Sequence, residues 1–274
     1  CDGDTMNPIL LSSFLDRLNT LLQSEDRTLE TTQRVFYEYV SFIDSFRELP
    51  KAEITEILEA FSPCLPEFRR TSQDVEMELE RLYAQSILAK QSTLTGYLTE
   101  RFEKIVAAEL ALFDRFLGVQ ENRRILFCGG GPVPISPVLM ALKDRNAQVT
   151  VIDQDAESCE LAESILRLHP HLQNITVLPV VSVEAVQDMN QFDAIVLAAM
   201  IGSNQEEKVE IYTKIAERTP AGKYLFTRSA NPEGMSLFQY DQFPFDQLSG
   251  LYEKVVFQPV SPDVTVHTVV LQRR

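Results

Sequence analysis

Three consecutive glycines, Gly129, Gly130 and Gly131, directly follow a short β-branched run and precede a predicted helix. Glycines at this position let the backbone turn tightly and approach a ligand, while the start of the helix presents free N–H groups. Pro132 and Pro134 replace amides that a pyrophosphate would need, and no glycine follows Gly131 where the helix of a dinucleotide motif packs. The segment therefore predicts a nucleoside-binding loop that includes Pro132, and it disfavours NAD.

Polar residues at the ends of the next two predicted strands would complete such a site. Asp153 stands about 20 residues after the glycines, where a carboxylate accepts hydrogen bonds from ribose hydroxyls, and Gln154 follows it. Asp155 has an alternative role as the N-cap of the next helix. Ser182 ends the third predicted strand, near the place where an adenine amino group is read. Without a pyrophosphate cradle, the pattern favours a nucleoside ligand such as S-adenosylmethionine.

A pair of carboxylates in the first half of the chain is the best candidate for proton transfer. Glu76 and Glu80 lie four residues apart in a helical pattern and so share a face, with Tyr83 one turn beyond Glu80. A carboxylate beside an amine can act as its general base. The alternative is that Glu76, Glu78 and Glu80 form a solvated acidic face.

Arg228 is the candidate for binding an anionic group. It stands just past the fifth predicted strand, at the carboxyl edge where open α/β sheets bind ligands. A guanidinium there can take a carboxylate bidentately, and a structural ion pair is the alternative. The histidines and cysteines lack the spacing typical of metal ligands, so no metal site is expected. Cys128 is expected to be a small buried apolar residue.

The elements that must position these residues fall into two parts. Residues 7–118 carry successive apolar stripes at helical spacing, interrupted by prolines and nearly free of glycine, which predicts a helical bundle. After Arg124, β-branched runs alternate with helical stretches, the pattern of βαβ units and a parallel sheet. The first five predicted strands cover residues 125–128, 149–152, 175–181, 194–198 and 224–227.

Two last strands, near residues 252–257 and 264–271, follow each other without a helix and predict an antiparallel hairpin at one sheet edge. The expected fold class is therefore α/β. An N-terminal helical bundle is expected over residues 1–120, as a lid on the acceptor side, and a C-terminal Rossmann-like domain of the S-adenosylmethionine-dependent methyltransferase type over residues 121–274.

The net charge of the chain limits the classes of molecule that it is expected to bind. The 274 residues carry a net charge of −15, which disfavours nucleic acid and anionic membrane surfaces. Residues 1–122 hold 22 acidic and 12 basic residues, a net charge of −10, so the candidate base lies in the more acidic half. No apolar run has the length of a membrane span, and the cysteines form no close pair, so a cytoplasmic protein is expected.

Several segments, taken together, resemble nicotianamine synthases. They are Phe127–Ser136, Phe192–Gly202 with Glu206–Val209, Arg228–Ala230, and Phe257–Val264 running into Val269–Leu271. Asp74–Tyr83 is similar to the glutamate-bearing helix of that family. The aromatic Pro-Tyr-Tyr run of the plant enzymes is absent, and Tyr97 stands near its place.

The resemblance implies a transferase that moves the 3-amino-3-carboxypropyl (2-aminobutanoyl) group of S-adenosylmethionine to an amine and releases 5′-methylthioadenosine, with no metal. Glu76 or Glu80 would be the base, Tyr97 or Tyr83 would orient the amine, and Arg228 would bind a carboxylate. Ala198 and Ala199 fall in a matching segment and would line the S-adenosylmethionine site with the glycine loop.

The chain is most similar to the short bacterial histidine 2-aminobutanoyltransferases of opine metallophore (staphylopine and pseudopaline) biosynthesis. The implied partners are a small amino acid such as histidine, an opine dehydrogenase that receives the product, and a second copy of the chain in a homodimer. Three alternatives stay open: a nicotianamine or thermonicotianamine synthase, an S-adenosylmethionine-dependent methyltransferase, and a non-catalytic nucleoside-binding module.

Overall fold

The computed structural model describes residues 8–46, 49–97, 99–178, 183, 186, 188–202, 204–230, 235–259 and 266–274. The first half is helical, as predicted. Its elements are α1 (Pro8–Gln23), α2 (Leu29–Ser45), α3 (Lys51–Phe61), α4 (Leu65–Leu88), the short 3₁₀ helix η1 (Leu94–Gly96) and α5 (Thr99–Leu117).

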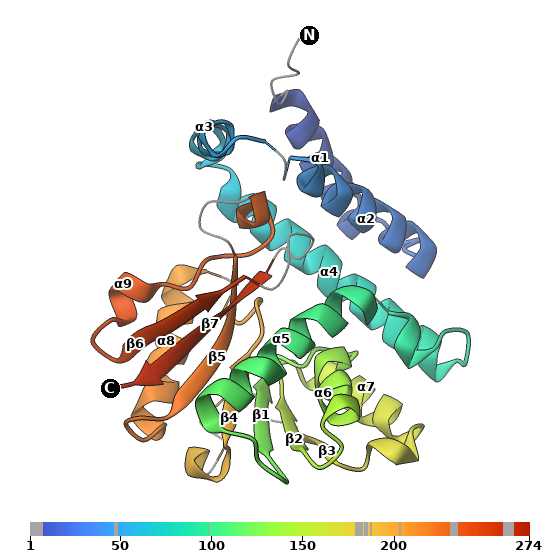
Figure 1. Ribbon diagram of the computed structural model, residues 1–274. Coiled ribbons are helices and arrows are strands. Elements are labelled where there is room, and N and C mark those ends of the chain that lie inside the picture. Colours follow the sequence, from blue (N-terminus) through green and yellow to red (C-terminus); the bar gives the residue numbers. More distant parts are fainter. Residues whose placement is uncertain are drawn as a thin grey trace.

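These helices form because each buries one apolar stripe, and α2 also begins at a residue that caps it. The side chain of Thr28 accepts a hydrogen bond from the backbone N–H of Thr31 and so caps α2. Val35, Tyr39 and Ile43 recur at four-residue spacing on α2 and are buried. The longest helix, α4, runs diagonally between α1–α3 and the sheet (Figure 1).

The second half alternates strands and helices around a seven-stranded sheet. The strands are β1 (Arg124–Cys128), β2 (Gln148–Ile152), β3 (Ile175–Leu178), β4 (Ala194–Leu197), β5 (Tyr224–Ala230), β6 (Tyr252–Gln258) and β7 (Val266–Arg273). The helices between them are α6 (Ile135–Lys143), α7 (Ala156–Arg167), η2 (Pro170–Leu172), η4 (Met189–Gln191), α8 (Gln205–Arg218), η5 (Met235–Phe238) and α9 (Phe245–Leu248).

The strand order is β3-β2-β1-β4-β5-β7-β6, and the first five strands of the chain pair in parallel. β7 is antiparallel to both β5 and β6, so the predicted terminal hairpin is confirmed at this edge. Successive strands are added on one side of β1 as far as β3 and on its other side from β4 onward, so the strand order reverses between β1 and β4. In open α/β sheets, ligands bind at such a switch point, beyond the carboxyl ends of the strands.

Alternating strand residues face two apolar layers, which confirms the α/β fold class. Phe127, Val151 and Phe226 point to the side covered by α5 and α6, where Phe113 of α5 meets Phe226 at a ring-centroid distance of 4.5 Å. Leu126 and Leu197 point to the opposite side, which α8 covers. The core that holds α5 on the sheet continues into α4 and α2, so the domain boundary near residue 120 stays a prediction.

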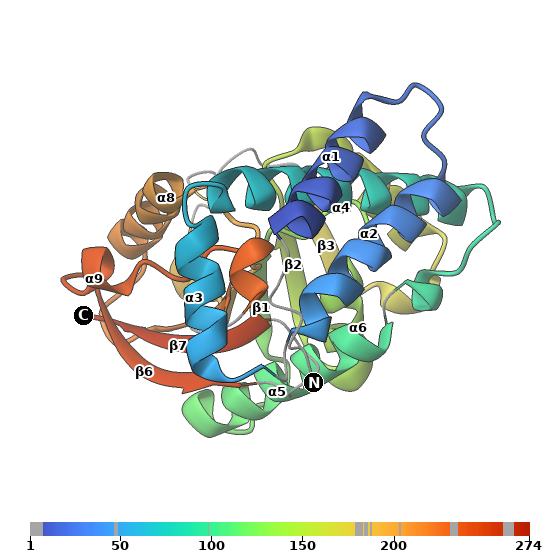
Figure 2. The ribbon, with the colours of Figure 1, turned by 90° about the horizontal axis from the view of Figure 1, so that it is seen from above.

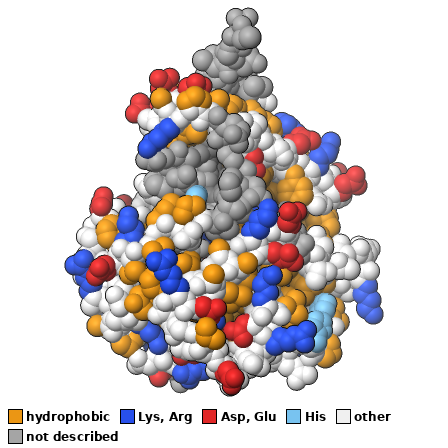
Figure 3. Space-filling model, viewed as in Figure 1, with side chains coloured by type: hydrophobic (Ala, Val, Ile, Leu, Met, Phe, Trp, Pro, Cys, Tyr) orange, Lys and Arg blue, Asp and Glu red, His pale blue; other side chains and the backbone are white. Residues whose placement is uncertain are grey.

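Seen from above, α4 extends across the end of the sheet (Figure 2). On the face shown in Figure 3, acidic and basic side chains are interspersed. Among the described residues, no helix is both long enough and apolar enough to cross a membrane.

Candidate active site

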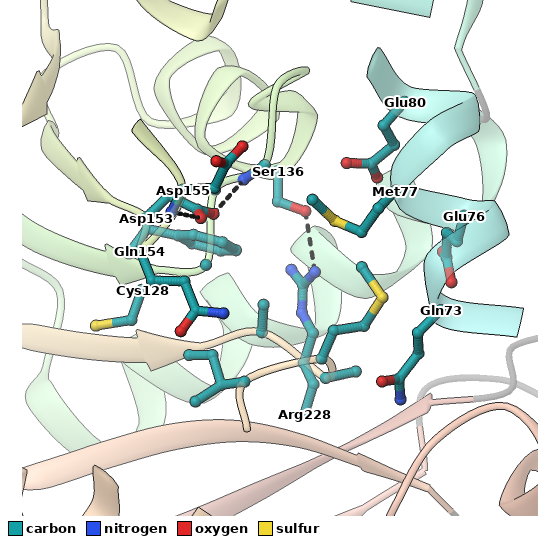
Figure 4. A pocket seen from close by; sticks show the side chains of 18 of the residues that line it. Gln73, Glu76, Met77, Glu80, Cys128, Ser136, Asp153, Gln154, Asp155 and Arg228 are labelled. Atoms are coloured by element: carbon teal, nitrogen blue, oxygen red, sulfur yellow. Dashed lines mark hydrogen bonds between the residues drawn. The ribbon is translucent and has the colours of Figure 1, made fainter. Parts of the chain in front are cut away.

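A cavity of about 480 Å³ lies where the carboxyl ends of the parallel strands face α4 and α5 (Figure 4). The sheet side is lined by the loops that follow β1, β2 and β4, together with Arg228 of β5. The helical side is lined by Gln73, Asp74, Glu76, Met77 and Glu80 of α4 and by Arg101, Phe102 and Ile105 of α5. Both halves of the chain therefore supply its walls.

The glycine loop after β1 forms one wall, and a side chain at two of its positions would force a neighbouring side chain to move. A Cβ on Gly130 would lie 2.2 Å from Val151 Cγ1 of β2, and a Cβ on Gly131 would lie 2.5 Å from Glu80 Oε2. Gly131 also has a φ of +64°, in the left-handed region that favours glycine. The loop is therefore in direct contact with the carboxylate of α4.

Asp153, at the end of β2, holds this loop. Its Oδ2 accepts a hydrogen bond of 2.8 Å from the Gly131 N–H, and its Oδ1 accepts one of 3.0 Å from the Asp155 N–H. Burial raises the pKa of Asp153. Asp155 accepts a hydrogen bond of 2.9 Å from the Ser158 N–H and caps α7, so the capping role considered for it is confirmed.

The two carboxylates of α4 point into the cavity from one helix face (Figure 4). Glu76 and Glu80 are each 8% exposed, so the alternative of a solvated acidic face is wrong for both. Glu78 lies outside this cavity, where it is partly buried and pairs with Arg27 and Arg81. Burial raises the pKa of Glu76, whereas Arg101 opposes this shift.

Glu76 and Glu80 differ in what holds them. The hydroxyl of Tyr240 lies 3.2 and 3.0 Å from the two carboxylate oxygens of Glu76 and donates to that group. Burial raises the pKa of Glu80 well above its usual range, and the neighbouring Glu76 and Asp153 carboxylates add to the shift. Glu80 thus lies between Glu76 and the glycine loop and binds a proton more readily than an ordinary carboxylate.

The two candidate tyrosines lie together behind this carboxylate pair. The rings of Tyr83 and Tyr97 are 4.7 Å apart, and neither side chain lines the cavity. The Tyr83 hydroxyl donates to the Thr93 carbonyl at 3.2 Å and fixes η1 against α4. The Tyr97 hydroxyl is buried and has no hydrogen-bond partner among the described residues. Its pKa is raised well above the usual range by burial and by Glu80 and Glu76.

Arg228 lies within β5 rather than just past it, because β5 extends to Ala230 in its pairing with β7. It forms the structural ion pair that was the alternative to binding a substrate carboxylate. Its Nε and Nη2 donate to the two carboxylate oxygens of Glu109 at 2.8 and 2.9 Å, and its Nη1 donates to Ser136 Oγ at 3.0 Å (Figure 4). Glu109 of α5 is fully buried. The guanidinium also lies over the Phe127 ring, 5.3 Å from the centroid. Arg228 therefore joins α5, α6 and the sheet at the cavity floor, and carboxylate binding by it stays a prediction.

The other predicted ligand-binding residues divide by position. Gln154, Ala198 and Ala199 line the cavity with the glycine loop. Pro132 is buried behind the loop rather than in the cavity wall. Ser182 lies outside the described residues. Cys128 is buried, and burial raises the pKa of its thiol to about 12, which fits an unreactive apolar residue.

Lys208 fixes the loop that carries the two alanines. Its Nζ donates to the carbonyls of Ala199 at 3.2 Å and Ile201 at 2.6 Å. Burial lowers the pKa of this lysine to about 8. Lys208 of α8 therefore holds the loop that follows β4 in place.

A segment after β5, residues 235–241, anchors α4 and was not expected from the sequence. Arg69 Nε donates to the Leu237 carbonyl at 2.6 Å, and Gln73 Nε2 donates to the Gln239 carbonyl at 3.2 Å. Arg69 also pairs with Asp241. With Tyr240 on Glu76, three successive turns of α4 are bonded to this one segment.

Sequence reasoning missed Tyr240, Arg101 and Glu109. Glu109 had a detectable signal, because it falls in the apolar stripe of α5 that contains Val106 and Phe113, where an unpaired carboxylate would be costly. Tyr240 lies in an aperiodic segment and offered none. No group of three or more His, Cys, Asp or Glu able to hold a metal ion occurs in the part of the chain that the structure describes.

The chain is similar in sequence to known nicotianamine synthases. A family model described as "Nicotianamine synthase protein" matches residues 14–274. Nicotianamine synthase 3 of Arabidopsis thaliana is 26% identical over 175 residues, covering 62% of this chain and 53% of the relative. Probable nicotianamine synthase 4 of the same plant is 23% identical over 283 residues, covering 100% of this chain and 83% of the relative. The chain thus spans about half the length of the first of these curated relatives.

Two solved structures share the fold. The crystal structure of MtNAS in complex with MTA and tNA has a TM-score of 0.78 at 19% identity and covers 97% of both chains. A glutamate-to-glutamine mutant of MtNAS in complex with S-adenosylmethionine has a TM-score of 0.74 at 19% identity, covering 96% of this chain and 98% of that one. Because the family model spans all but the first 13 residues, the chain belongs to the nicotianamine synthase family.

Proposed function

We propose that this protein transfers the 3-amino-3-carboxypropyl group of S-adenosylmethionine to the amine of an amino acid and releases 5′-methylthioadenosine. Membership of the nicotianamine synthase family supports the reaction class. The MtNAS structures with S-adenosylmethionine and with MTA support a nucleoside in the corresponding cavity. The observation that carries the proposal is the contact between Glu80 and the Gly131 backbone, which sets a buried carboxylate beside the nucleoside loop.

In this proposal the glycine loop and Asp153 hold the nucleoside, with Gln154, Ala198 and Ala199 around it. The sulfonium then lies toward α4, where Glu80 and Asp153 provide negative charge. A cation within a few ångströms favours the ionised form of a carboxyl group. Binding of the substrate therefore opposes the burial that raises the pKa of Glu80, and it prepares the carboxylate for proton transfer.

The reaction itself needs correct alignment and one proton acceptor. The amine nitrogen uses its lone pair to form a bond to the γ-carbon of the methionine moiety. The bond between that carbon and sulfur breaks, both electrons stay on sulfur, and the sulfonium becomes the neutral thioether of 5′-methylthioadenosine. Glu80 accepts the proton that the amine loses. Tyr240 holds Glu76, the second carboxylate, in place, and the charge of Glu76 stabilises the positive charge that develops on the nitrogen as it bonds to the γ-carbon.

We take histidine as the acceptor and an opine metallophore precursor as the product, because of the resemblance to the short bacterial transferases. An opine dehydrogenase would then consume that product. The second candidate is synthesis of a nicotianamine-type or thermonicotianamine-type product from S-adenosylmethionine or glutamate. The coverage of 97% of both chains in the MtNAS complex with tNA favours this candidate.

The test is to incubate the protein with S-adenosylmethionine and, separately, L-histidine, D-histidine or glutamate, and to identify the nucleoside and amino-acid products by chromatography and mass spectrometry. Release of 5′-methylthioadenosine with one acceptor is expected. S-adenosylhomocysteine instead would identify a methyltransferase. Nucleoside binding without any turnover would identify a binding module and refute the proposal.

The close approach of Gly131 to Glu80 yields a second test. Gly131→Ala places a Cβ 2.5 Å from Glu80 Oε2 at a φ of +64°, and we expect it to weaken S-adenosylmethionine binding by more than about 10-fold. The left-handed backbone alone costs an L-residue about 1–2 kcal/mol. Gly222→Ala is the matched control, because Gly222 has a φ of +85° and nothing within 4 Å of an added Cβ.

Both variants place a side chain on left-handed backbone and are destabilised by it, so only the contact with Glu80 distinguishes them. Calorimetric titration of each with S-adenosylmethionine and thermal melting of each without ligand would separate binding from stability. Equal Kd values in the two variants would show that the loop does not hold the nucleoside.

A further inference from the structure

Ser136, in the first turn of α6, carries a hydroxyl proton that finds no acceptor among the described residues. The residue is 3% exposed, and its side chain points from α6 into the cavity (Figure 4). Its Oγ accepts a hydrogen bond of 3.0 Å from Arg228 Nη1. A hydroxyl group has one proton to donate and two lone pairs, so this contact leaves the proton for another partner. A ligand in the cavity can supply the missing acceptor.

The backbone at the start of α6 offers a second donor. Pro134 stands at the N-cap position and makes no side-chain capping bond. The Val138 N–H bonds to the Pro134 carbonyl, and Pro137 has no N–H. The Ser136 N–H has no acceptor in the described part of the chain. Ser136 therefore presents two donors at a helix start that carries partial positive charge.

Arg228 and Glu109 set the sign of the charge behind Ser136. The guanidinium of Arg228 lines the cavity, whereas the Glu109 carboxylate, which accepts its hydrogen bonds of 2.8 and 2.9 Å, is fully buried and does not. The pair is therefore oriented with its positive end toward the cavity. A hydrogen bond from a cation also polarises the Ser136 hydroxyl and makes its proton a stronger donor. The surroundings of Ser136 thus favour an anionic ligand group.

We propose that Ser136 binds a substrate carboxylate in this cavity, and that Arg228 is the positioning residue that orients its hydroxyl. This inference rests on the proposed function and deepens it, because it makes the substrate class α-amino acids rather than simple amines. Both S-adenosylmethionine and an amino-acid acceptor carry an α-carboxylate. Near Glu76 and Glu80, on the helical side of the cavity, such a group would be strongly disfavoured. On the sheet side it meets the donors of Ser136 instead.

The experiment compares Ser136→Ala and Ser136→Thr with wild type in calorimetric binding, turnover and thermal melting. If the carboxylate belongs to S-adenosylmethionine, Ser136→Ala should raise its Kd by about 10- to 100-fold, the usual effect of losing a hydrogen bond to a charged group. The Kd of 5′-methylthioadenosine, which lacks a carboxylate, should stay unchanged. Ser136→Thr keeps the hydroxyl and should recover most of the affinity.

If the carboxylate instead belongs to the acceptor, Ser136→Ala should raise the acceptor KM by a similar factor and leave both Kd values unchanged. Either pattern supports the proposal. Ser229→Ala is the matched control and should change none of these constants. Ser229 is also 3% exposed and follows Arg228 in β5, but it does not line the cavity and already donates to the Ala230 carbonyl at 3.1 Å.

The positioning role of Arg228 is tested by a double-mutant cycle. Arg228→Lys keeps a positive charge opposite Glu109 but gives up the rigid fork that reaches Ser136 at the same time. It should raise the same constant that Ser136→Ala raises, and it should have no further effect when combined with Ser136→Ala. Full additivity of the two substitutions would show that Arg228 does not act through Ser136.

In a folded Ser136→Ala protein, three unchanged constants would overturn the proposal. Equal weakening of S-adenosylmethionine and 5′-methylthioadenosine would also overturn it, because it would indicate a structural role alone. If Ser136→Ala does not fold, Ser136→Cys takes its place, because a thiol is similar in size and only a weak donor. A wild type that releases no 5′-methylthioadenosine with any acceptor refutes the proposed function instead, while the binding constants still report on Ser136.

Discussion

Replacing Glu80 with glutamine is expected to lower kcat by about 10²–10⁴-fold, the usual contribution of a general base. Glutamine keeps the size of the side chain but accepts no proton. The Kd for 5′-methylthioadenosine should stay within about twofold of wild type, because the neutral product depends on the glycine loop and Asp153. Single-turnover assays and calorimetry on the same protein would separate the chemical step from binding.

The matched control is Glu78→Gln, on the same helix but with its side chain on Arg27 and Arg81. We expect it to leave kcat unchanged. Glu76→Gln should raise the KM for the acceptor more than it lowers kcat. In the proposed reaction Glu76, which Tyr240 holds in place, interacts with the acceptor, whereas Glu80 accepts the proton. A normal kcat in Glu80→Gln would remove Glu80 from the mechanism, and normal 5′-methylthioadenosine release in both Glu76→Gln and Glu80→Gln would refute the whole catalytic assignment.

Glu80→Gln, which is expected to lower kcat, is expected to raise the stability of the folded protein. The pKa of Glu80 is raised above its usual value of 4.5, so the folded protein binds this proton more tightly than the unfolded chain does. The folded state is therefore progressively disfavoured as the pH rises from about 4.5 to the raised pKa. Glu80→Gln removes this penalty, and its Tm near neutral pH should exceed that of wild type. The limb of the pH–kcat/KM profile that rises as Glu80 ionises should disappear with it.

The buried pair of Arg228 and Glu109 should have the largest effect on folding. Glu109→Gln leaves the buried guanidinium without its counter-charge, and such a loss costs about 3–5 kcal/mol in the free energy of unfolding. Denaturant titration monitored by circular dichroism measures it. We expect the double variant Glu109→Leu with Arg228→Met to recover most of the loss, because no unpaired charge remains.

Glu163→Gln is the control for this prediction. Glu163 pairs with Arg167 at 2.7 Å on α7, with both side chains more than half exposed, and exposed pairs contribute about 0–1 kcal/mol. A loss of less than about 1 kcal/mol in Glu109→Gln would show that Arg228 stays solvated or finds another acceptor. Arg228 would then again be a candidate for binding a substrate carboxylate.

The fold was predictable because its signals are local. The glycines after β1, the acidic residue after β2 and the closing hairpin of β6 and β7 all follow from residue order alone. The helix carrying Glu76 and Glu80 was also predictable, and its 3.6-residue period puts Glu78 on the opposite side, which explains why Glu78 pairs with arginines outside the cavity. Periodicity could therefore have separated Glu78 from the pair formed by Glu76 and Glu80, while the catalytic role of that pair stays a prediction.

The contacts that assemble the site were not predictable, because they join residues far apart in the chain. Glu109 and Arg228 are 119 positions apart, and Tyr240 and Glu76 are 164 positions apart. No pattern in one sequence reports which buried carboxylate meets which donor. The role expected for Tyr83 shows the converse error, since its position one turn from Glu80 was correct while its hydroxyl bonds to Thr93 and lies away from the cavity.

The hydrogen bonds between α4 and the segment 235–241 also limit where this helix can accept inserted or deleted residues. Arg69, Gln73, Glu76 and Glu80 meet their partners in turn along one helix face, from the Leu237 carbonyl to the glycine loop. One inserted or deleted residue between Arg69 and Glu80 would rotate the rest of α4 by roughly 100° and shift it by about 1.5 Å. The carboxylate would then leave the glycine loop while the anchor at Arg69 stayed in place. The number of residues from Arg69 to Glu80 is therefore fixed more strictly than their identities, and length changes in the first half of the chain must fall outside this interval.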